Sequence, residues 1–282
     1  MICSMEGSCV CRAETMKAYI ITMTDDSAST DAATVAIRSS VEVGNRFTID
    51  PFDATTPNRV DTEMELYDIK WNWPWRNIEV DLHSGLTKQP YLTADPKKRI
   101  ACFLSHYRLW LTCQSMSEPV LIFEHDVLFK RKLNLDLLYE TKYDIVGLND
   151  PRKATRKSAL YHEQVQRQDG QIVHCPKIDV DNIPQGLAGN SAYYIKPSGA
   201  QKLISLVKEY GAWPNDAIMC RQLMPGKLGQ LKKYATTIQS LESTTTLWNR
   251  LLLQLHLNRN LLHVRNGVSH LCLSTMSRCL MR

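Results

Sequence analysis

Two carboxylates separated by a single residue stand directly after an apolar run. Glu124 and Asp126 follow Val120 to Phe123, four apolar residues that predict a strand buried on both faces. Side chains alternate along an extended chain, so Glu124 and Asp126 face one side and His125 the other. A divalent cation shared by the two carboxylates would offset the free energy of their desolvation. The alternative is that two acidic residues end a strand simply to meet water.

Such a cation would be Mg²⁺ or Mn²⁺, because both prefer oxygen ligands and bind carboxylates together with substrate phosphates. A cation in that position could neutralise a diphosphate leaving group. Ligands of open α/β sheets bind beyond the carboxyl ends of the strands, which is where Glu124 and Asp126 fall.

The segment before this strand predicts a helix of about four turns. Asp95 is a good N-cap and Pro96 suits the first helical position. The expected apolar face comprises Ile100, Phe103, Leu104, Tyr107 and Leu111.

Ser105 and His106 are neighbours in this helix, where adjacent side chains point about 100° apart. A nucleophilic Ser-His pair is therefore disfavoured. We expect His106 to pack behind the strand of Glu124 and donate a hydrogen bond, or to support a contact with a donor substrate.

The remaining elements alternate between strands and helices, which predicts an α/β fold with a central sheet. Residues 56–94 and 153–177 are polar, and we expect irregular chain in the first and an exposed hairpin or mobile loop in the second. The expected strands are 18–23, 47–49 (ending near Asp50 and Asp53), 143–148 and 190–195, and the expected helices lie around 33–37, from Pro197 to Gly211, and from Trp213-Pro214-Asn215-Asp216 onward.

Composition and length fit one globular domain, since 44% of the 282 residues are hydrophobic and 22% are charged. We expect a disordered extension at 1–15, a single domain at 16–246 and a basic tail at 247–282. The sequence has no run of 18 apolar residues and no basic-then-apolar start, so we expect a cytoplasmic location. Its nine cysteines show no C-x-x-C spacing, which argues against a disulfide framework and a zinc site.

The net charge of +5 comes entirely from the end of the chain. No acidic residue follows Glu242, whereas five arginines do, so the first 242 residues are formally neutral. Nucleic-acid binding therefore loses its electrostatic argument. Residues 247–262 are amphipathic and basic, which is compatible with a cover helix, a partner helix or peripheral contact with a membrane.

Several motifs together resemble glycosyltransferase family 25, the family of lipopolysaccharide biosynthesis enzymes that is also related to collagen galactosyltransferases. A helix with a Cys-x-x-Ser-His core at 102–106 precedes a strand that ends Glu-His-Asp, where the family has Glu-Asp-Asp. The resemblance spans about residues 16–246 and adds strands at 16–23 and 49–53, a Gly-x-x-x-Tyr-x-Ile-x-x-x-Gly-Ala segment at 189–200 and Pro-x-Asp at 214–216.

The resemblance implies a GT-A type fold and inverting transfer of a hexose, galactose or glucose, from a UDP-sugar to a glycan or glycolipid acceptor, with Mn²⁺ or Mg²⁺. Glu124 and Asp126 would hold the metal and diphosphate, and Asp53 would lie near the nucleoside. Asp216 is the candidate base, although it could equally be a carboxylate that stabilises a helix start. Ser105, His106 and Asn190 are further candidates for binding the donor, and Asn190 could equally satisfy a turn.

Aromatic residues offer faces on which a sugar ring could stack. Trp213, just before Asp216, is the better candidate for an acceptor platform, while core packing is expected for at least two of Trp71, Trp73 and Trp75.

The departures from the family pattern keep two other functions open. His125 replaces an Asp, Ala101 stands where Gly is frequent, and the Arg that commonly follows the first strand is missing from 25–27. A non-catalytic glycan-binding or scaffold protein on the same fold would tolerate these changes. A metal-dependent nucleotidyltransferase would also use paired carboxylates at a strand end.

Overall fold

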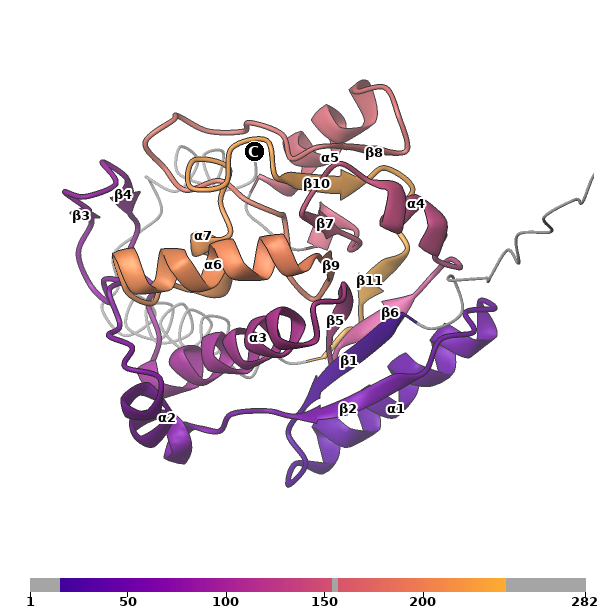
Figure 1. Cartoon of the computed structure of the whole chain (residues 1–282), viewed down its shortest axis with the longest axis horizontal. Coiled ribbons are helices and arrows are strands. Elements are labelled where there is room, and N and C mark those ends of the chain that lie inside the picture. The colour runs from indigo at the N-terminus through magenta and orange to yellow at the C-terminus, as the bar shows by residue number, and fades with distance from the viewer. Residues whose placement is uncertain (1–15, 154–156, 242–282) are drawn as a thin grey trace, which may run out of the picture. The chain divides into compact units, whose positions relative to one another are not determined.

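The computed structural model describes residues 16–153 and 157–241, so the extension expected at 1–15 and the tail expected at 247–282 lie outside the described residues. A mixed seven-stranded sheet forms the centre, and helices flank it (Figure 1). This is the α/β architecture, a mixed central sheet between helices, that the sequence predicts.

The strand order of the central sheet is β2-β1-β5-β9-β7-β10-β8. Strands β2, β1, β5, β7 and β10 run in one direction, while β9 and β8 run antiparallel to their neighbours. Its strands are β1 (Lys17–Thr22), β2 (Ile49–Asp53), β5 (Val120–Glu124), β7 (Ile145–Gly147), β8 (Ile172–His174), β9 (Ala192–Ile195) and β10 (Leu228–Leu231). Two small sheets pair β3 (Glu79–Val80) with β4 (Thr87–Lys88), and β6 (Val127–Phe129) with β11 (Thr236–Ile238).

Helices cover both faces of this sheet. The helices are α1 (Ser27–Glu42), α2 (Val60–Leu66), α3 (Pro96–Met116), α4 (Leu135–Glu140), α5 (Ser158–Arg167), α6 (Pro197–Tyr210) and α7 (Asn215–Ile218), with 3-10 turns η2 (Pro57–Arg59) and η3 (Pro151–Lys153). Helices α3 and α6 lie side by side over one face, where Ile122 and Tyr193 belong to their core cluster (Figure 1). Leu121 and Phe123 belong to the cluster that includes α1 on the other face, as the alternation of a strand requires.

Local chemistry sets the ends of α3. Asp95 accepts a hydrogen bond from the amide of Lys97, Pro96 occupies the first turn, and Ser117 ends the helix in the left-handed region at φ 54°. The helix is longer than predicted, at 21 residues, and its polar Ser105 and His106 are buried as well as its apolar face. Helix α3 is therefore a central element, with a buried polar side that points to a function.

Three secondary-structure predictions were wrong. Residues 56–94 contain η2, α2, β3 and β4 rather than only irregular chain. The polar stretch 153–177 contains α5 and β8, because Tyr161 and Val165, one turn apart, supply a buried stripe on an otherwise polar helix. The strand that the apolar residues predict at 47–49 begins two residues later and occupies 49–53, the range that the family resemblance predicts, and an edge position lets β2 accommodate Pro51.

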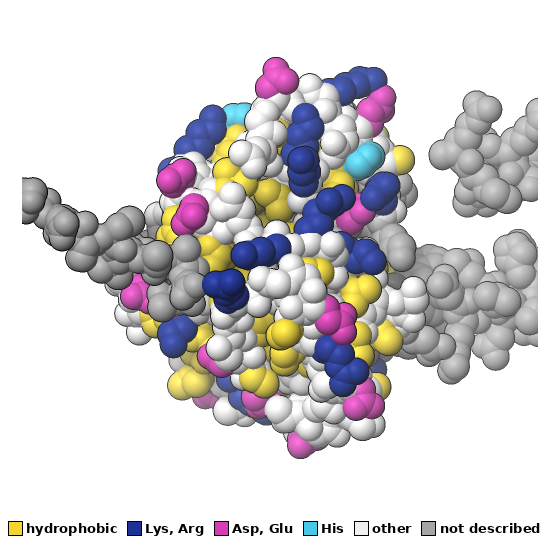
Figure 2. All heavy atoms as spheres, turned by 90° about the vertical axis from the view of Figure 1, so that its right-hand side faces the viewer, with side chains coloured by type: hydrophobic (Ala, Val, Ile, Leu, Met, Phe, Trp, Pro, Cys, Tyr) yellow, Lys and Arg dark blue, Asp and Glu magenta, His cyan; other side chains and the backbone are white. Residues whose placement is uncertain are grey.

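The surface shows no single-sign patch on the side that Figure 2 presents. Lys and Arg side chains are spread there among Asp and Glu, in agreement with the formal neutrality of the first 242 residues. None of the helices within 16–153 and 157–241 combines the length and the apolar character that crossing a membrane requires.

Candidate active site

The topology brings several polar residues to one edge of the sheet. Strands β2, β1 and β5 are parallel and end at that edge, and β9, which is antiparallel to β5, begins there. Asp53 at the end of β2, Glu124 at the end of β5 and Ser191 just before β9 therefore share it. The backbone joins the last two, since the amide of Glu124 donates to the carbonyl of Ser191 at 2.8 Å.

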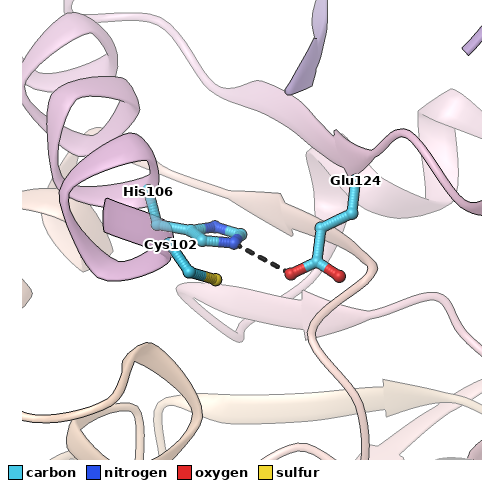
Figure 3. A group of neighbouring side chains, drawn as sticks. All are labelled: Cys102, His106 and Glu124. Atoms are coloured by element: carbon cyan, nitrogen blue, oxygen red, sulfur yellow. Dashed lines mark hydrogen bonds and ion pairs between the residues drawn. The ribbon is translucent and has the colours of Figure 1, made fainter. Parts of the chain in front are cut away.

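Two side chains hold the carboxylate of Glu124. His106 Nε2 lies 3.1 Å from Oε1 (Figure 3), and the hydroxyl of Ser191 donates to Oε2 at 3.1 Å. Burial would raise the pKa of Glu124, but the hydrogen bonds from His106 and Ser191 and the charge of Arg99 outweigh it and lower that pKa. Glu124 is therefore an ionised carboxylate with its partners already in place.

A chain of buried hydrogen bonds fixes the orientation of His106. Trp110 Nε1 donates to the hydroxyl of Tyr193 at 2.9 Å, and that hydroxyl lies 2.9 Å from His106 Nδ1. Because an indole can only donate, the Tyr193 oxygen accepts from Trp110, and its own proton can be directed to Nδ1. The Nε2–H tautomer then donates to Glu124, which satisfies every member of the chain.

Asp126 has a different environment. It is half-buried, and its Oδ1 is buried with no hydrogen-bond partner in the part of the chain that the structure describes. Burial and the negative charge of Glu124 raise the pKa of Asp126 to about 7, and a hydrogen bond with Ser191 offsets them only in part. A carboxylate in this setting gains free energy from a cation that binds beside it.

Asn190 supplies a second oxygen without a partner. Its side chain is buried, its Nδ2 lies 3.9 Å from the sulfur of Met219, and its Oδ1 has no partner among the described residues. The turn role considered for Asn190 would occupy that oxygen, and the described residues contain no such hydrogen bond.

His125 lies in the turn between Glu124 and Asp126. Burial lowers its pKa, while the charges of Glu124 and Asp26, the N-cap of α1, act in the opposite direction. Gln239 fixes this turn, because its Nε2 donates to the carbonyls of His125 and Val127 at 3.3 and 3.0 Å. The turn therefore has a defined backbone.

Asp53 is half exposed at the same edge. Thr24 donates to its Oδ1 at 2.9 Å, and Arg59 pairs with its Oδ2 at 2.8 Å.

Ser105 is buried, and its hydroxyl has a partner in both directions. It donates to the carbonyl of Ala101 and accepts from the amide of Thr55, both at 2.9 Å. The prediction that Ser105 contacts a donor is therefore corrected to a structural role, in which it joins α3 to the chain that follows β2.

Asp216, the candidate base, forms an ion pair with Arg99 across 2.6 Å. The Asp216 side chain is 51% exposed, whereas that of Arg99 is 11% exposed. The guanidinium also lies 4.4 Å from the ring centre of Tyr91, and although burial opposes its charge, Asp216 raises the pKa of Arg99. Arg99 thus holds a half-exposed carboxylate at the start of α7.

Trp213 does not form the predicted acceptor platform. The indole is fully buried, with ring centres 5.3 Å from Trp73 and 6.1 Å from Tyr210. Burial leaves no face to stack on a sugar, so Trp213 is a core residue. Trp71 and Trp75 are partly buried and stack on each other at 5.1 Å, which fits the packing expected of them.

Sequence reasoning missed three residues of this site. Arg99, Tyr193 and Ser191 hold Asp216, His106 and Glu124, respectively. Tyr193 is the tyrosine of the Gly-x-x-x-Tyr segment at 189–200, but that motif assigns it no role, and Arg99 and Ser191 are weak signals by themselves. Their partners are 117, 87 and 67 positions away in the sequence, so the contacts appear only in the fold.

The comparisons with known proteins now add to this geometry. The model of glycosyltransferase family 25, described as an LPS biosynthesis protein family, matches residues 16–219. The chain therefore belongs to glycosyltransferase family 25, and it is a glycosyltransferase. The match spans the helix with the Cys-x-x-Ser-His core, the Glu-x-Asp strand end and Asp216.

Similar solved structures are also glycosyltransferases. The galactosyltransferase LgtC in complex with donor and acceptor sugar analogues is 11% identical, with a TM-score of 0.40 over 86% of this chain and 96% of that one. Mouse xyloside xylosyltransferase 1 is 8% identical, with a TM-score of 0.41 over 77% and 85%. The bifunctional glycosyltransferase WbbM is 10% identical, with a TM-score of 0.38 over 76% and 38%. The comparison with curated proteins gave no match.

Proposed function

We propose that this glycosyltransferase moves a hexose, galactose or glucose, from a UDP-sugar to the hydroxyl of a glycan or glycolipid acceptor, with inversion at the anomeric carbon. The observation that supports it most is the pairing of an ionised Glu124 with Asp126, whose Oδ1 is buried without a partner, at the sheet edge where α/β enzymes bind ligands. The cytoplasmic location and peripheral membrane contact through the tail remain predictions.

The oxygen ligands at this site suit a hard divalent cation, Mn²⁺ or Mg²⁺. Glu124 and Asp126 offer carboxylate oxygens, and the unpartnered Oδ1 of Asp126 gives a specific reason for a cation to bind there. When bound, such an ion supplies positive charge to a diphosphate leaving group. Asn190 Oδ1 would accept a hydrogen bond from a donor hydroxyl, and Asp53 would accept one from the ribose.

Asp216 would act as general base. In an inverting displacement the acceptor oxygen bonds to the anomeric carbon as the bond from that carbon to the diphosphate oxygen breaks. The proton of the acceptor hydroxyl passes to the Asp216 carboxylate. Arg99 holds Oδ1 of Asp216 at 2.6 Å, and the half-exposed side chain can still meet an acceptor. Arg99 would thus be a positioning residue.

A thermal-shift panel tests the donor and the metal together. Purified protein is melted with UDP-, GDP- and CMP-sugars, each with and without Mn²⁺, and Asp126→Asn is melted alongside. The proposal predicts a stabilisation that needs both a UDP-sugar and the metal and that Asp126→Asn loses. Asp169→Asn, at an exposed carboxylate before β8, is the matched control and keeps the shift. A wild-type protein that no UDP-sugar stabilises contradicts the proposal.

Replacing the base separates chemistry from binding. Asp216→Asn keeps the shape of the side chain but cannot take a proton, so we expect kcat to fall by about 100-fold or more while UDP-sugar binding persists. Transfer is measured by UDP release, and the anomeric configuration of the product by NMR. A retained configuration or an unchanged kcat would remove Asp216 from this role.

A further inference from the structure

A cysteine and a histidine of α3 converge with Glu124 behind the end of β5. Cys102 and His106 are one helical turn apart, so they project from the same face of the helix. The sulfur, the imidazole nitrogen and the carboxylate oxygen all lie within 4.8 Å of one another. Figure 3 shows the three side chains directed at one another from the helix and the strand.

This ligand set differs in chemistry from the pair formed by Glu124 and Asp126. A soft thiolate together with an imidazole favours the borderline-soft Zn²⁺, whereas carboxylates alone favour Mg²⁺ or Mn²⁺. Metal–ligand bonds of about 2.0 to 2.3 Å place the ligand atoms of a tetrahedral zinc site about 3.5 Å apart. His106 Nε2 and Glu124 Oε1 already lie 3.1 Å apart, so binding mainly requires the Cys102 sulfur to approach them, and a fourth position would remain open.

Tyr193 can support His106 as a metal ligand once the hydrogen bond between the two side chains reverses its direction. As a metal ligand, His106 would move its proton from Nε2 to Nδ1, which lies 2.9 Å from the Tyr193 hydroxyl. The hydroxyl oxygen has two lone pairs, so it can accept from Nδ1–H while it still accepts from Trp110. Histidine ligands commonly donate their second ring nitrogen to such an oxygen.

We propose that Cys102, His106 and Glu124 form a second cation site, which takes Zn²⁺ and shares Glu124 with the site for the hard cation. Binding releases the thiol proton of Cys102 to solvent, while the His106 proton moves from Nε2 to Nδ1. This site was not predicted, because the C-x-x-C spacing typical of zinc is absent from the sequence. Zinc in this position draws Glu124 away from Asp126 and inhibits transfer. That consequence rests on the proposed function, whereas the binding of zinc does not.

Cobalt absorption tests the site without nucleotide or substrate. Co²⁺ is titrated into the full chain, and a thiolate ligand gives a near-ultraviolet charge-transfer band that carboxylates and imidazoles do not give. We expect Cys102→Ser to lose one equivalent of this band and Cys113→Ser to keep it. Cys113 is the matched control, since it lies on the same helix but contacts the carbonyls of Glu118 and Ile195. Equal bands in the two variants overturn the proposal.

A second measurement uses the unmodified protein, so that it does not depend on the folding of a variant. The rate of Cys102 alkylation is followed by peptide mass spectrometry with and without Zn²⁺. The proposal expects zinc to slow modification of Cys102, and an unchanged rate overturns it. A protein that passes both tests but binds no UDP-sugar with Mn²⁺ would retain the zinc site and lose the proposed function, so the two can fail separately.

Discussion

The polar groups behind the end of β5 and those in the turn that follows it differ in whether their hydrogen bonds are satisfied. Behind the strand, Trp110, Tyr193, His106 and Glu124 form a buried hydrogen-bonded chain in which each group has its partner. In the turn beyond it, Asp126 carries a buried oxygen with no partner among the described residues. Two carboxylates two residues apart therefore have pKa values shifted in opposite directions.

This difference separates structural stability from ligand binding. A satisfied polar network stabilises the fold and fixes one arrangement, whereas an unpaired buried carboxylate destabilises it until a ligand binds. Glu124 belongs to both, because it ends the buried chain and its negative charge acts on Asp126. Substitutions on the two sides should therefore affect folding and binding in different proportions.

The largest expected effect is on binding at Asp126. Asp126→Asn removes one of the two carboxylates, so Mn²⁺-dependent UDP-sugar binding should weaken by about 100-fold or more, since residues one step behind a metal ligand already matter by 10- to 100-fold. The free energy of unfolding without metal, measured at pH 8 by urea titration, should stay the same or rise, because a buried charge is lost. A variant that binds UDP-sugar normally, or that unfolds more easily without metal, would contradict the assignment of Asp126 to ligand binding rather than to stability.

Glu124→Gln should destabilise the protein even without metal. The change removes the charge that accepts hydrogen bonds from His106 and Ser191, and bonds of this kind contribute about 2 kcal/mol. Urea titration of the metal-free protein measures the loss, with Asp126→Asn as the comparison. If both variants lower the free energy of unfolding equally, the hydrogen bonds of Glu124 do not stabilise the fold more than the side chain of Asp126 does.

The buried chain itself gives a smaller effect with a close control. Tyr193→Phe removes the hydroxyl between Trp110 and His106, which leaves two buried groups unsatisfied, and should lower the free energy of unfolding by about 1.5 kcal/mol. Tyr194→Phe, at the next position of β9, removes a hydroxyl that is buried without a partner in the described chain and should be neutral or stabilising. The reverse order of the two variants would show that the chain of hydrogen bonds does not stabilise the fold.

Sequence reasoning reached the elements of this site because their signals are local. The N-cap Asp95 and the apolar run before Glu124 each act within a few residues, and both α3 and β5 form where they predict. The family pattern then identified the glycosyltransferase class. The prediction for the polar segment 153–177 was wrong because local signals do not show tertiary burial. Helix α5 depends on burying two residues, Tyr161 and Val165, in a tertiary core.

The side-chain environments could not be predicted, because they depend on contacts across the fold. Ser105 and His106 are adjacent in sequence, yet one is committed to the backbone of Ala101 and Thr55 and the other to Glu124. Trp213 stands three residues before Asp216, but the packing of Trp73 against it buries its ring. Spacing alone gives neither result.

The pH dependence distinguishes the two carboxylates within one protein. The folded-state pKa of Asp126 is raised to about 7, so between about pH 4 and 7 the folded state holds a proton that the unfolded state has released. Its contribution to the free energy of unfolding therefore falls as pH rises through this window and is constant above it. The lowered pKa of Glu124 has the opposite sign, because its stabilisation is present above the unfolded value and is lost as pH falls through the folded one.

The affinity for Mn²⁺ should depend on the same ionisation of Asp126. Mn²⁺ needs the ionised form of Asp126, so its apparent affinity should rise roughly tenfold per pH unit up to about pH 7 and then level off. Calorimetric titration of Mn²⁺ from about pH 5.5 to about pH 8.5, a range that includes the pKa of Asp126, measures how the affinity changes with pH. Asp126→Asn, which has no proton to lose at that position, should remove both the slope in affinity and the fall in the free energy of unfolding. An affinity that does not change with pH would mean that Asp126 is already ionised, and the turn beyond β5 would then be as complete as the chain behind it.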